Sequence, residues 1–346
     1  MDPGLRRGDE MKEPRPFLAM TTGDPAGVGI WTGATAALNA SLRRRCRPLL
    51  VGDAWAIHHF LRTPAAVLPL TDLSDYQDHP NVLNVLHVPH PGISALRLGA
   101  PSRLGGESAV MAIQTAVGLA LRGEVAAVVT GPVSKESLHL AKIPFPGHTE
   151  LLQAMTGAPR VEMLMAAGPL KGLLITRHIP LKEVSDSLSV RRIVEAVRLA
   201  DDFLRRRSRH TPRWALCGLN PHAGDNGLLG SEEKRVVDPA AARLRALGVS
   251  IDEPLPADVA WARHAQGRYD ACACLYHDQG MIPLKALYPS RVVNVTVGLP
   301  FVRTSPGHGT AFDLASGRRP FARADPSATL EAAGLAIALS SNKPHN

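Results

Sequence analysis

Short apolar runs alternate with longer amphipathic stretches along this chain. Many of the runs are bounded by Gly or Pro, a pattern typical of buried strands. They occupy residues 17–20, 47–53, 81–88, 125–130, 171–178, 214–217, 272–276 and 292–299. Apolar residues recur at helical spacing between them, at 54–61, 105–123 and 190–205. Strands that alternate with helices in this way predict an α/β fold with mostly parallel sheets.

Three histidines follow apolar runs at similar positions. His178, His222 and His277 stand in the sequences TRHIP, NPHAG and YHDQG. Parallel strands bring their carboxyl ends to one rim of a sheet, so these side chains could converge there. Three neutral imidazoles with an open position suit Zn²⁺ or a similar divalent ion that acts as a Lewis acid, and Asp278 could orient one ligand or coordinate the metal itself. Any one of them taken alone would more often be structural.

Basic and amide side chains that could hold an anion lie in the same part of the sequence. Lys285, Asn294 and Arg303 follow apolar runs, and two cations with an amide donor suit a phosphate or a carboxylate. The alternative is a surface lysine and a structural arginine. His148 and Thr149 open a predicted helix, whose free N–H groups could also meet an anion. Simple capping by Thr149 explains that position equally well.

A glycine-rich turn follows the first predicted strand. The sequence TTGDPAGVG, residues 21–29, resembles a phosphate-binding loop, but it lacks the G-x-G-x-x-G spacing and the Walker lysine. A tight turn between a strand and a helix that begins near Trp31 explains it equally well.

Size and composition narrow the class of protein. The 346 residues exceed the usual size of a single core, which favours two lobes. The net charge of +8 has no basic stripe with interleaved aromatic residues, which argues against a nucleic-acid partner. The four cysteines are read as small buried side chains in a reducing compartment. We expect a disordered leader over residues 1–16 and, because no signal peptide or membrane span is evident, a cytoplasmic protein.

Six sequence blocks together resemble a known family. They are TTGDPAGVG, TGPVSKESLHLAKIPFPGHTELL, LCGLNPHAGDNGLLGSEE, LPAD, YHDQG-x-x-P-x-K and NVTVGLPFVRTS-x-x-HGTAFDLA. In this order they are similar to the 4-hydroxythreonine-4-phosphate dehydrogenases, the PdxA family of pyridoxal phosphate biosynthesis. The resemblance extends from about residue 17 to the C-terminus.

The resemblance implies a fold and an assembly. The fold would be that of isocitrate and isopropylmalate dehydrogenases, two α/β lobes with the active-site cleft between them. Residues 17–135 with 308–346 would form the cofactor-side lobe, and residues 136–307 the lobe for substrate, metal and dimerisation. The active site would lie at the interface of a homodimer.

The resemblance also implies site residues and cofactors. One divalent ion per subunit (Zn, Mg or Co) would be held by His178, His222 and His277. The phosphorylated four-carbon acid substrate would contact His148, Thr149, Lys285, Asn294 and Arg303. NAD or NADP would contact His308, Gly309, Thr310, Ala311 and Asp313. Asp278 and Lys135 are candidates for the catalytic base, although no sequence feature singles out either.

The expected reaction is the oxidation of 4-phosphooxy-L-threonine, with loss of CO₂ to give 3-amino-2-oxopropyl phosphate. Two departures from the family pattern bear on it: the first motif lacks the usual carboxylate near Trp31, and Gly307 stands where the family usually has Asp. One alternative is a threonate or erythronate 4-phosphate dehydrogenase, whose substrate has a hydroxyl in place of the amine. Another is a homologue that binds a phosphorylated metabolite without turnover. The dihydrodiol branch lacks the Lys and Arg clamp and is rejected.

Overall fold

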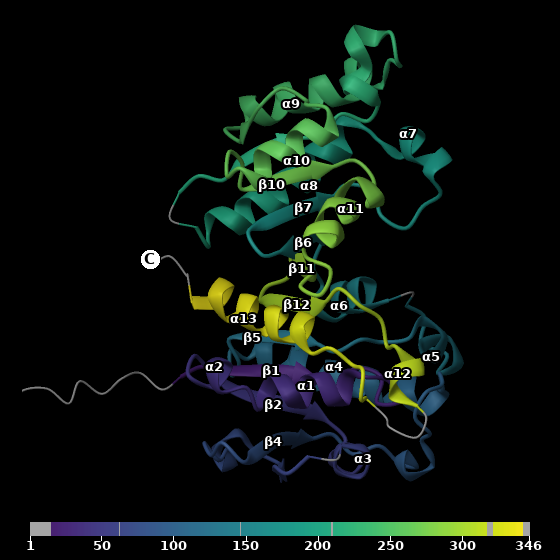
Figure 1. Ribbon diagram of the computed structural model, residues 1–346, viewed down its shortest axis with the longest axis vertical. Helices are drawn as coiled ribbons and strands as arrows, with labels where there is room; N and C mark the ends of the chain where they lie inside the picture. The colour runs from purple at the N-terminus through teal and green to yellow at the C-terminus, as the bar shows by residue number, and fades with distance from the viewer. Residues whose placement is uncertain (1–14, 62, 146, 209, 317–320, 342–346) are drawn as a thin grey trace, which may run out of the picture.

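A single mixed sheet runs through the whole protein. The computed structural model describes residues 15–61, 63–145, 147–208, 210–316 and 321–341. Within these residues the strands form one 12-stranded sheet in the order β3-β4-β2-β1-β5-β12-β11-β6-β7-β10-β8-β9 (Figure 1). The strands are β1 Phe17–Thr21, β2 Arg47–Gly52, β3 Ala66–Leu70, β4 Val82–His87, β5 Ala127–Thr130, β6 Glu162–Ala167, β7 Leu170–Leu174, β8 Arg213–Leu216, β9 Ser250–Ile251, β10 Ala271–Cys274, β11 Val293–Val297 and β12 Val302–Pro306.

The predicted α/β class with a mostly parallel sheet is confirmed. Most neighbouring strands are parallel, whereas β11 runs antiparallel to both β6 and β12, and β6 runs antiparallel to β7. β12 lies between β5 and β11, so the sheet continues from one predicted lobe into the other. The lobe boundaries themselves stay a prediction, and the predicted leader falls almost entirely on residues 1–14, outside the described residues.

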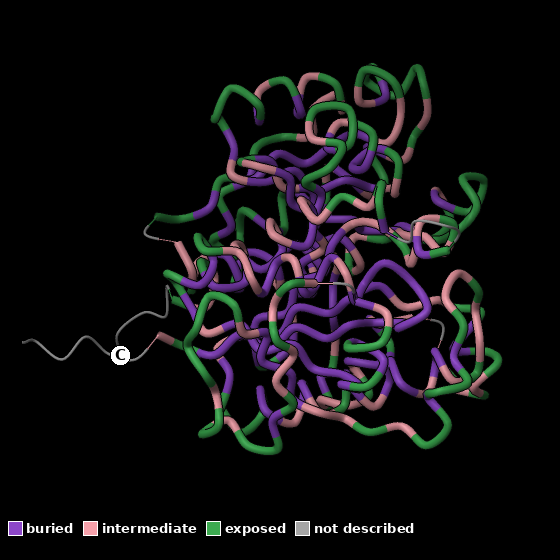
Figure 2. The backbone as a smooth tube through the Cα atoms, turned by 60° about the horizontal axis from the view of Figure 1, so that its bottom comes forward, coloured by how far each residue is buried: buried purple, intermediate pink, exposed green. Residues whose placement is uncertain are grey.

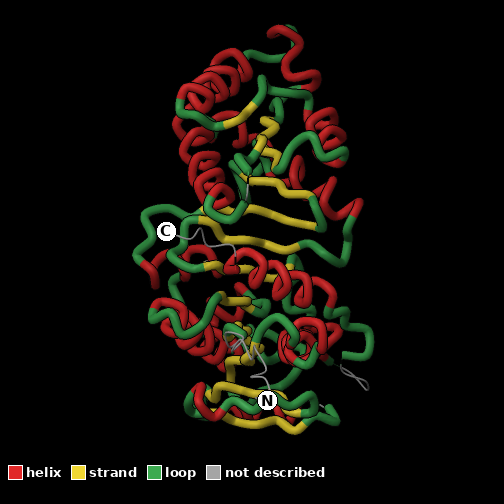
Figure 3. Tube along the Cα trace, turned by 90° about the vertical axis from the view of Figure 1, so that its left-hand side faces the viewer, coloured by secondary structure: helices red, strands yellow, loops and turns green. Residues whose placement is uncertain are grey.

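Helices cover both faces of the sheet (Figure 3), and the backbone is most buried along the strands (Figure 2). The helices are α1 Gly29–Ala37, α2 Ala40–Arg43, α3 Ala54–Phe60, α4 Arg103–Leu121, α5 Lys135–Leu140, α6 His148–Thr156, α7 Val184–Ser187, α8 Val190–Arg205, α9 Asp238–Ala246, α10 Ala257–Ala265, α11 His277–Leu287, α12 Phe312–Ala315 and α13 Ser327–Ser341. Among the described helices, α4 alone is long and apolar enough to cross a membrane by length and composition. More than half of it is buried and it packs on β1 and β2, so it is a core helix.

Two local expectations differ from the structure in their bounds, and a third is confirmed. The strand expected to end at His178 ends at Leu174; the N–H groups of Ile175 and Thr176 still bond to the carbonyls of Cys274 and Leu275, after which the chain turns. The helix expected near Trp31 begins at Gly29. The four cysteines are buried and unpaired, which confirms their prediction as small core residues.

Glycines allow the first strand and the β5–α5 turn to touch. A Cβ added to Gly131 would lie 2.5 Å from the carbonyl carbon of Thr22 and 2.6 Å from the oxygen of Thr21. The N–H of Gly131 donates to the carbonyl of Thr21 across 3.0 Å. This contact places the ends of β1 and β5, and the turns that follow them, side by side.

Gly131→Ala should therefore lower the free energy of unfolding by about 1–3 kcal/mol, because backbone atoms cannot move aside for the added methyl group. Urea denaturation would measure the loss. Gly118→Ala on α4 is the matched control: its nearest neighbour is the flexible end of Arg122 at 3.2 Å, and alanine favours a helix by about 1 kcal/mol. Equal midpoints for the two variants would contradict the tight-contact explanation.

Candidate active site

Side chains from distant parts of the sequence line one cavity of about 270 Å³, here called the histidine cavity. It lies where β5, β7 and β12 end and β11 begins, because its lining includes Pro132, Leu174, Pro306 and Asn294. Its polar lining residues are His148, His178, His277, Lys285, Asn294, Ser305 and His308. Six of these seven were predicted as site residues, and the structure brings those six together.

Two of the three predicted metal ligands are neighbours in this cavity. His277 opens α11, and His178 lies just beyond β7. Their ring centroids are 5.7 Å apart, which fits two imidazoles that share one ion, since metal–nitrogen bonds of about 2.1 Å place such rings about 5 Å apart. Asp278 Oδ1 lies 2.7 Å from Nδ1 of His277 and can orient that ring. The pKa of His178 is lowered by partial burial, then by the charges of Lys135 and His277, which favours the neutral imidazole that a metal requires.

The third predicted ligand, His222, lies elsewhere on the chain. It belongs to a short segment, Pro221–Gly227, in which His222, Ala223, Asp225 and Asn226 all have positive φ. The carboxylate of Glu233 holds the base of this segment by accepting the N–H groups of Leu219 and Asn220 at 2.9 and 2.7 Å. His222 does not line the histidine cavity, and the described part of the chain contains no group of three His, Cys, Asp or Glu residues close enough to hold a metal.

A second wall of the histidine cavity carries polar atoms that have no partner among the described residues. Nε2 of His148, Oδ1 of Asn294 and Nε2 of His308 are each sealed from solvent and make no hydrogen bond. Leaving a buried polar atom unpaired costs about 1–3 kcal/mol, so three of them around one cavity indicate a polar ligand. Lys285, in the last turn of α11, adds a positive charge to the same wall.

Arg303 does not line the histidine cavity and lies behind this wall. Its side chain is 0% exposed in the middle of the sheet, where it donates to the hydroxyls of Thr296 and Thr130 while Nε has no partner. Burial lowers the pKa of Arg303 to about 9, so it remains charged at neutral pH. Burial and the charge of Arg303 together lower the pKa of His148 to about 3, which keeps that imidazole neutral.

The remaining predicted residues lie around the cavity. Thr149 is buried in the first turn of α6; the N-cap is Gly147 without a side-chain bond, so capping by Thr149 was the wrong alternative. Lys135 is the first residue of α5, and Ser134 caps that helix by accepting the N–H of Ser137. Thr149 and Lys135 do not line the histidine cavity, although the positive charge of Lys135 lowers the pKa of His178.

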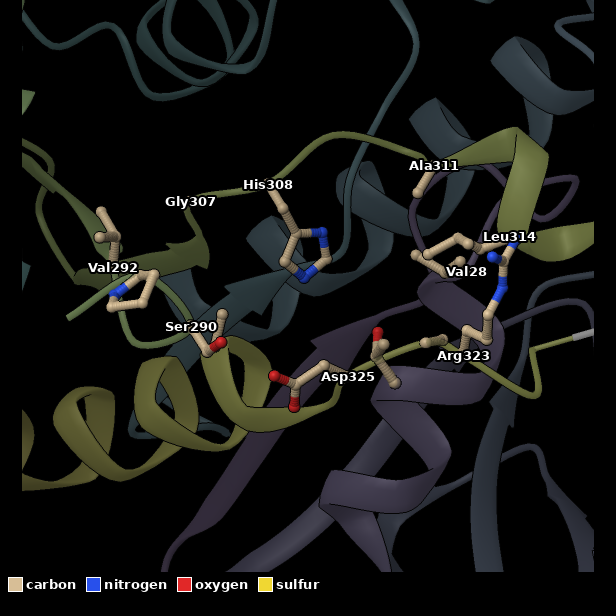
Figure 4. A pocket seen from close by; sticks show the side chains of 13 residues that line it. Val28, Ser290, Val292, Gly307, His308, Ala311, Leu314, Arg323 and Asp325 are labelled. Atoms are coloured by element: carbon tan, nitrogen blue, oxygen red, sulfur yellow. The ribbon is translucent and has the colours of Figure 1, made fainter. Parts of the chain in front are cut away.

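A second cavity of about 240 Å³, here called the loop cavity, adjoins the first (Figure 4). Gly307 and His308 line both, so this short segment divides them. Of the predicted cofactor residues, His308 and Ala311 line the loop cavity and Gly309 lines the histidine cavity. Thr310 and Asp313 line neither, but the carbonyl of Thr310 accepts the N–H of Val28, which ties the glycine-rich turn to this loop.

Several loop-cavity residues were not predicted from the sequence. Besides His308, its polar side chains are those of Thr32, Ser290, Arg323 and Asp325, of which the last three are labelled in Figure 4. Asp325 precedes α13, and its Oδ1 accepts the N–H of Ser327 at 2.9 Å, an ordinary capping pattern that gives no functional signal in the sequence. Gly307 stands where the sequence pattern usually has Asp. In this structure a Cβ at that position would lie 2.8 Å from the carbonyl oxygen of Val292, so glycine avoids a steric clash.

Comparisons with known proteins point to one family. The family model described as "Pyridoxal phosphate biosynthetic protein PdxA" matches residues 44–336. The chain is 39% identical over 307 residues to 4-hydroxythreonine-4-phosphate dehydrogenase of Desulfosudis oleivorans, covering 87% of this chain and 90% of the relative. It is also 39% identical over 303 residues to D-threonate 4-phosphate dehydrogenase of Salmonella typhimurium, covering 86% and 92%. A crystal structure of 4-hydroxythreonine-4-phosphate dehydrogenase from Klebsiella pneumoniae superposes with a TM-score of 0.86 at 38% identity, covering 94% and 99%.

The low pKa of His148 predicts a pH-dependent loss of stability. Above pH 6.5 the imidazole is neutral in both the folded and the unfolded chain, so it contributes no pH dependence. Below that pH only the unfolded chain takes up the proton. Unfolding free energies from urea titrations at pH 7.5 and 5 should therefore fall by about 2 kcal/mol more in the wild type than in His148→Asn. Equal losses in the two proteins would show that His148 does protonate in the fold.

Proposed function

The chain belongs to the PdxA family of oxidoreductases, and from this premise we propose that it oxidises 4-phosphooxy-L-threonine with NAD. The product would lose CO₂ to give 3-amino-2-oxopropyl phosphate, a step in the biosynthesis of pyridoxal 5'-phosphate. The main support is the convergence of unpaired buried atoms of His148, Asn294 and His308 on a cavity that also holds Lys285 and two histidines. A phosphorylated acid would satisfy these groups.

The proposed substrate contacts follow from charge and position. Lys285 and Asn294 would bind the phosphate, and Thr149 with the first N–H groups of α6 would bind a second anionic or hydroxyl group. Arg303 would add a fixed positive potential from inside the sheet. His148 stays neutral, so its ring can accept or donate one hydrogen bond without adding charge.

The redox step needs groups that the chain can hold but does not itself contain. A divalent ion on the histidines would act as a Lewis acid toward the substrate's alcohol oxygen, and NAD(P) beside the HGTA loop would accept the hydride. Asp278 would orient His277 through its 2.7 Å contact. Asp278 and Lys135 are our candidates to accept the hydroxyl proton, and Lys135 would do so as the neutral amine. Gly307 and His308 would separate the acid from the cofactor's adenosine end.

We further propose that a second copy of the chain completes the metal site. Large apolar side chains are exposed beside each predicted ligand: Leu181 at 72% follows His178, Leu228 at 82% follows His222, and Ile282 at 64% lies on the helix that His277 opens. Large apolar side chains that are exposed to this degree are typical of an interface. A homodimer that buries them would let His222 of the partner subunit join His178 and His277, which already share a cavity. We expect such an enzyme in the cytoplasm, without nucleic-acid or membrane partners.

A second candidate function is the oxidation of D-threonate or D-erythronate 4-phosphate. It is favoured by the D-threonate 4-phosphate dehydrogenase of Salmonella typhimurium, which is as similar to this chain as the hydroxythreonine enzyme above. The two kinds of substrate differ at one position, which carries an amine in 4-phosphooxy-L-threonine and a hydroxyl in the sugar acid. The alternative of an inactive binder is disfavoured, because it would not need the open pair of histidines.

The two substrates can be separated by the rate of NADH formation. We expect kcat/KM to be higher for 4-phosphooxy-L-threonine than for D-threonate 4-phosphate by at least tenfold, about 1.4 kcal/mol of transition-state discrimination. Both substrates should be assayed with NAD and NADP at saturating Zn²⁺, Mg²⁺ and Co²⁺ in turn. A tenfold preference for the sugar acid would establish the second candidate, and absence of turnover with both would favour the inactive binder.

Mixing inactive chains tests the shared metal site. His222→Ala and His277→Ala should each be inactive alone, but their mixture after subunit exchange should recover about one quarter of the wild-type activity and metal content. Heterodimers make up half of a random mixture, and each keeps one intact site. The matched control is His178→Ala mixed with His277→Ala, which should stay inactive because both ligands come from the same chain. Recovery in the control alone would mean that His178, not His222, crosses the interface, and recovery in both mixtures would mean that His277 does.

A further inference from the structure

A third and larger cavity lies at the opposite edge of the sheet from the histidine cavity. It has a volume of about 730 Å³ and is here called the rear cavity. Its lining includes Phe17 and Val302, the first residues of β1 and β12, and Ala126 just before β5. The histidine cavity lies beyond the other ends of β5 and β12. The rear cavity is therefore separate from the site already described.

Two arginine–phenylalanine stacks face the rear cavity from different elements. The guanidinium of Arg47 lies 3.7 Å from the ring centroid of Phe17, and that of Arg207 lies 4.0 Å from the ring of Phe203. The ring of Phe17 holds the guanidinium of Arg47 from one face, and the edge of a stacked guanidinium can meet a carboxylate or phosphate in its plane. Nε of Arg47 donates to the carbonyl of Arg15 across 2.7 Å, which leaves its two terminal nitrogens without a hydrogen bond among the described residues.

Arg47 and Arg206 bring positive charge to the rear cavity, and within the described residues neither makes an ion pair. The one carboxylate among the described lining residues, Glu124, is paired with Arg122 outside the cavity. An anion beside Arg47 and Arg206 would balance their charge.

From this arrangement we propose that the rear cavity binds a small organic anion, with an apolar or aromatic body and one carboxylate or phosphate group. The body would lie against Phe17, Phe203 and the turn at residues 298–301, and the anionic group would meet Arg47 and Arg206. The same turn joins β11 to β12, the strands that carry Asn294 and Arg303. A ligand there is therefore in a position to act as an effector of the histidine cavity.

Benzoate is a suitable probe, followed by isothermal titration calorimetry on the whole protein. We expect one benzoate per chain, and a Kd that rises about tenfold in Arg206→Gln and in Arg47→Gln, the loss of one charge-assisted hydrogen bond. Arg198→Gln is the matched control, since it removes the same charge from an exposed position of the same helix, α8, away from the cavity. Benzyl alcohol and inorganic phosphate should each bind at least tenfold more weakly, because each lacks one half of the recognised group.

The histidine cavity also attracts anions, so Lys285→Gln separates the two sites. Benzoate binding should be unchanged in that variant. Arg206 is exposed, so its substitution should leave the melting temperature at the wild-type value and the test interpretable. No heat of benzoate binding, or binding that is lost in Lys285→Gln and retained in Arg47→Gln and Arg206→Gln, would overturn the proposal. The arginines would then serve only to neutralise the carboxyl end of α8.

Discussion

The burial of Arg303 is the constraint on which the proposed site depends. A guanidinium enclosed in a sheet with two threonine hydroxyls for partners carries a desolvation cost of several kcal/mol. Within the described residues no carboxylate forms an ion pair with it. The sheet can tolerate that cost because β5 and β11 supply Thr130 and Thr296 from either side. The charge that remains favours an anion in the adjoining cavity and disfavours a second cation; together with burial, which is the larger cause, it lowers the pKa of His148 to about 3 and keeps that imidazole neutral.

The mixed direction of the sheet decides where the other groups lie. If β11 ran parallel to its neighbours, Asn294 would lie at the far edge, because it is near the start of that strand. The antiparallel pairing of β11 with β6 and β12 instead places the start of β11 beside the end of β12, where Ser305 is found. β7 and β10 run opposite to β5 and β12, because β11/β12, β6/β11 and β6/β7 are all antiparallel pairs, so His178 and His277 follow strand ends that lie toward the other edge. The two walls of the histidine cavity meet across β6, because Met163, which pairs with Leu174 at the end of β7, and Met165, which pairs with Asn294, both line the cavity.

Much of this could be predicted from the sequence, for reasons that are local. Buried strands are apolar runs, and a serine such as Ser134 caps the helix that follows it, so periodicity and capping located most elements. The burial of Arg303 could not be predicted, because an arginine between valine and threonine looks the same at a strand end and inside one. The separation of His222 from His178 was also hidden, since spacing in sequence does not reveal that residues 221–227 turn away with positive φ. Asp325 was overlooked because a carboxylate before a helix is explained by capping alone.

The incomplete histidine set has a consequence for how the protein would work. The sheet and its main apolar core lie within one chain, since the largest buried cluster extends from Leu18 to Ile337 without a partner. A pair of imidazoles, by contrast, binds a metal far more weakly than three. On the proposed assembly, folding would need one chain, whereas metal binding and turnover would need two. Metal binding and dimer formation would then be coupled. The ion would stabilise the dimer, and the dimer would raise the affinity for the ion, by the same free energy. Activity would depend on protein concentration even where the fold does not, and the exposed leucines beside His178 and His222 would be the physical cause of that difference.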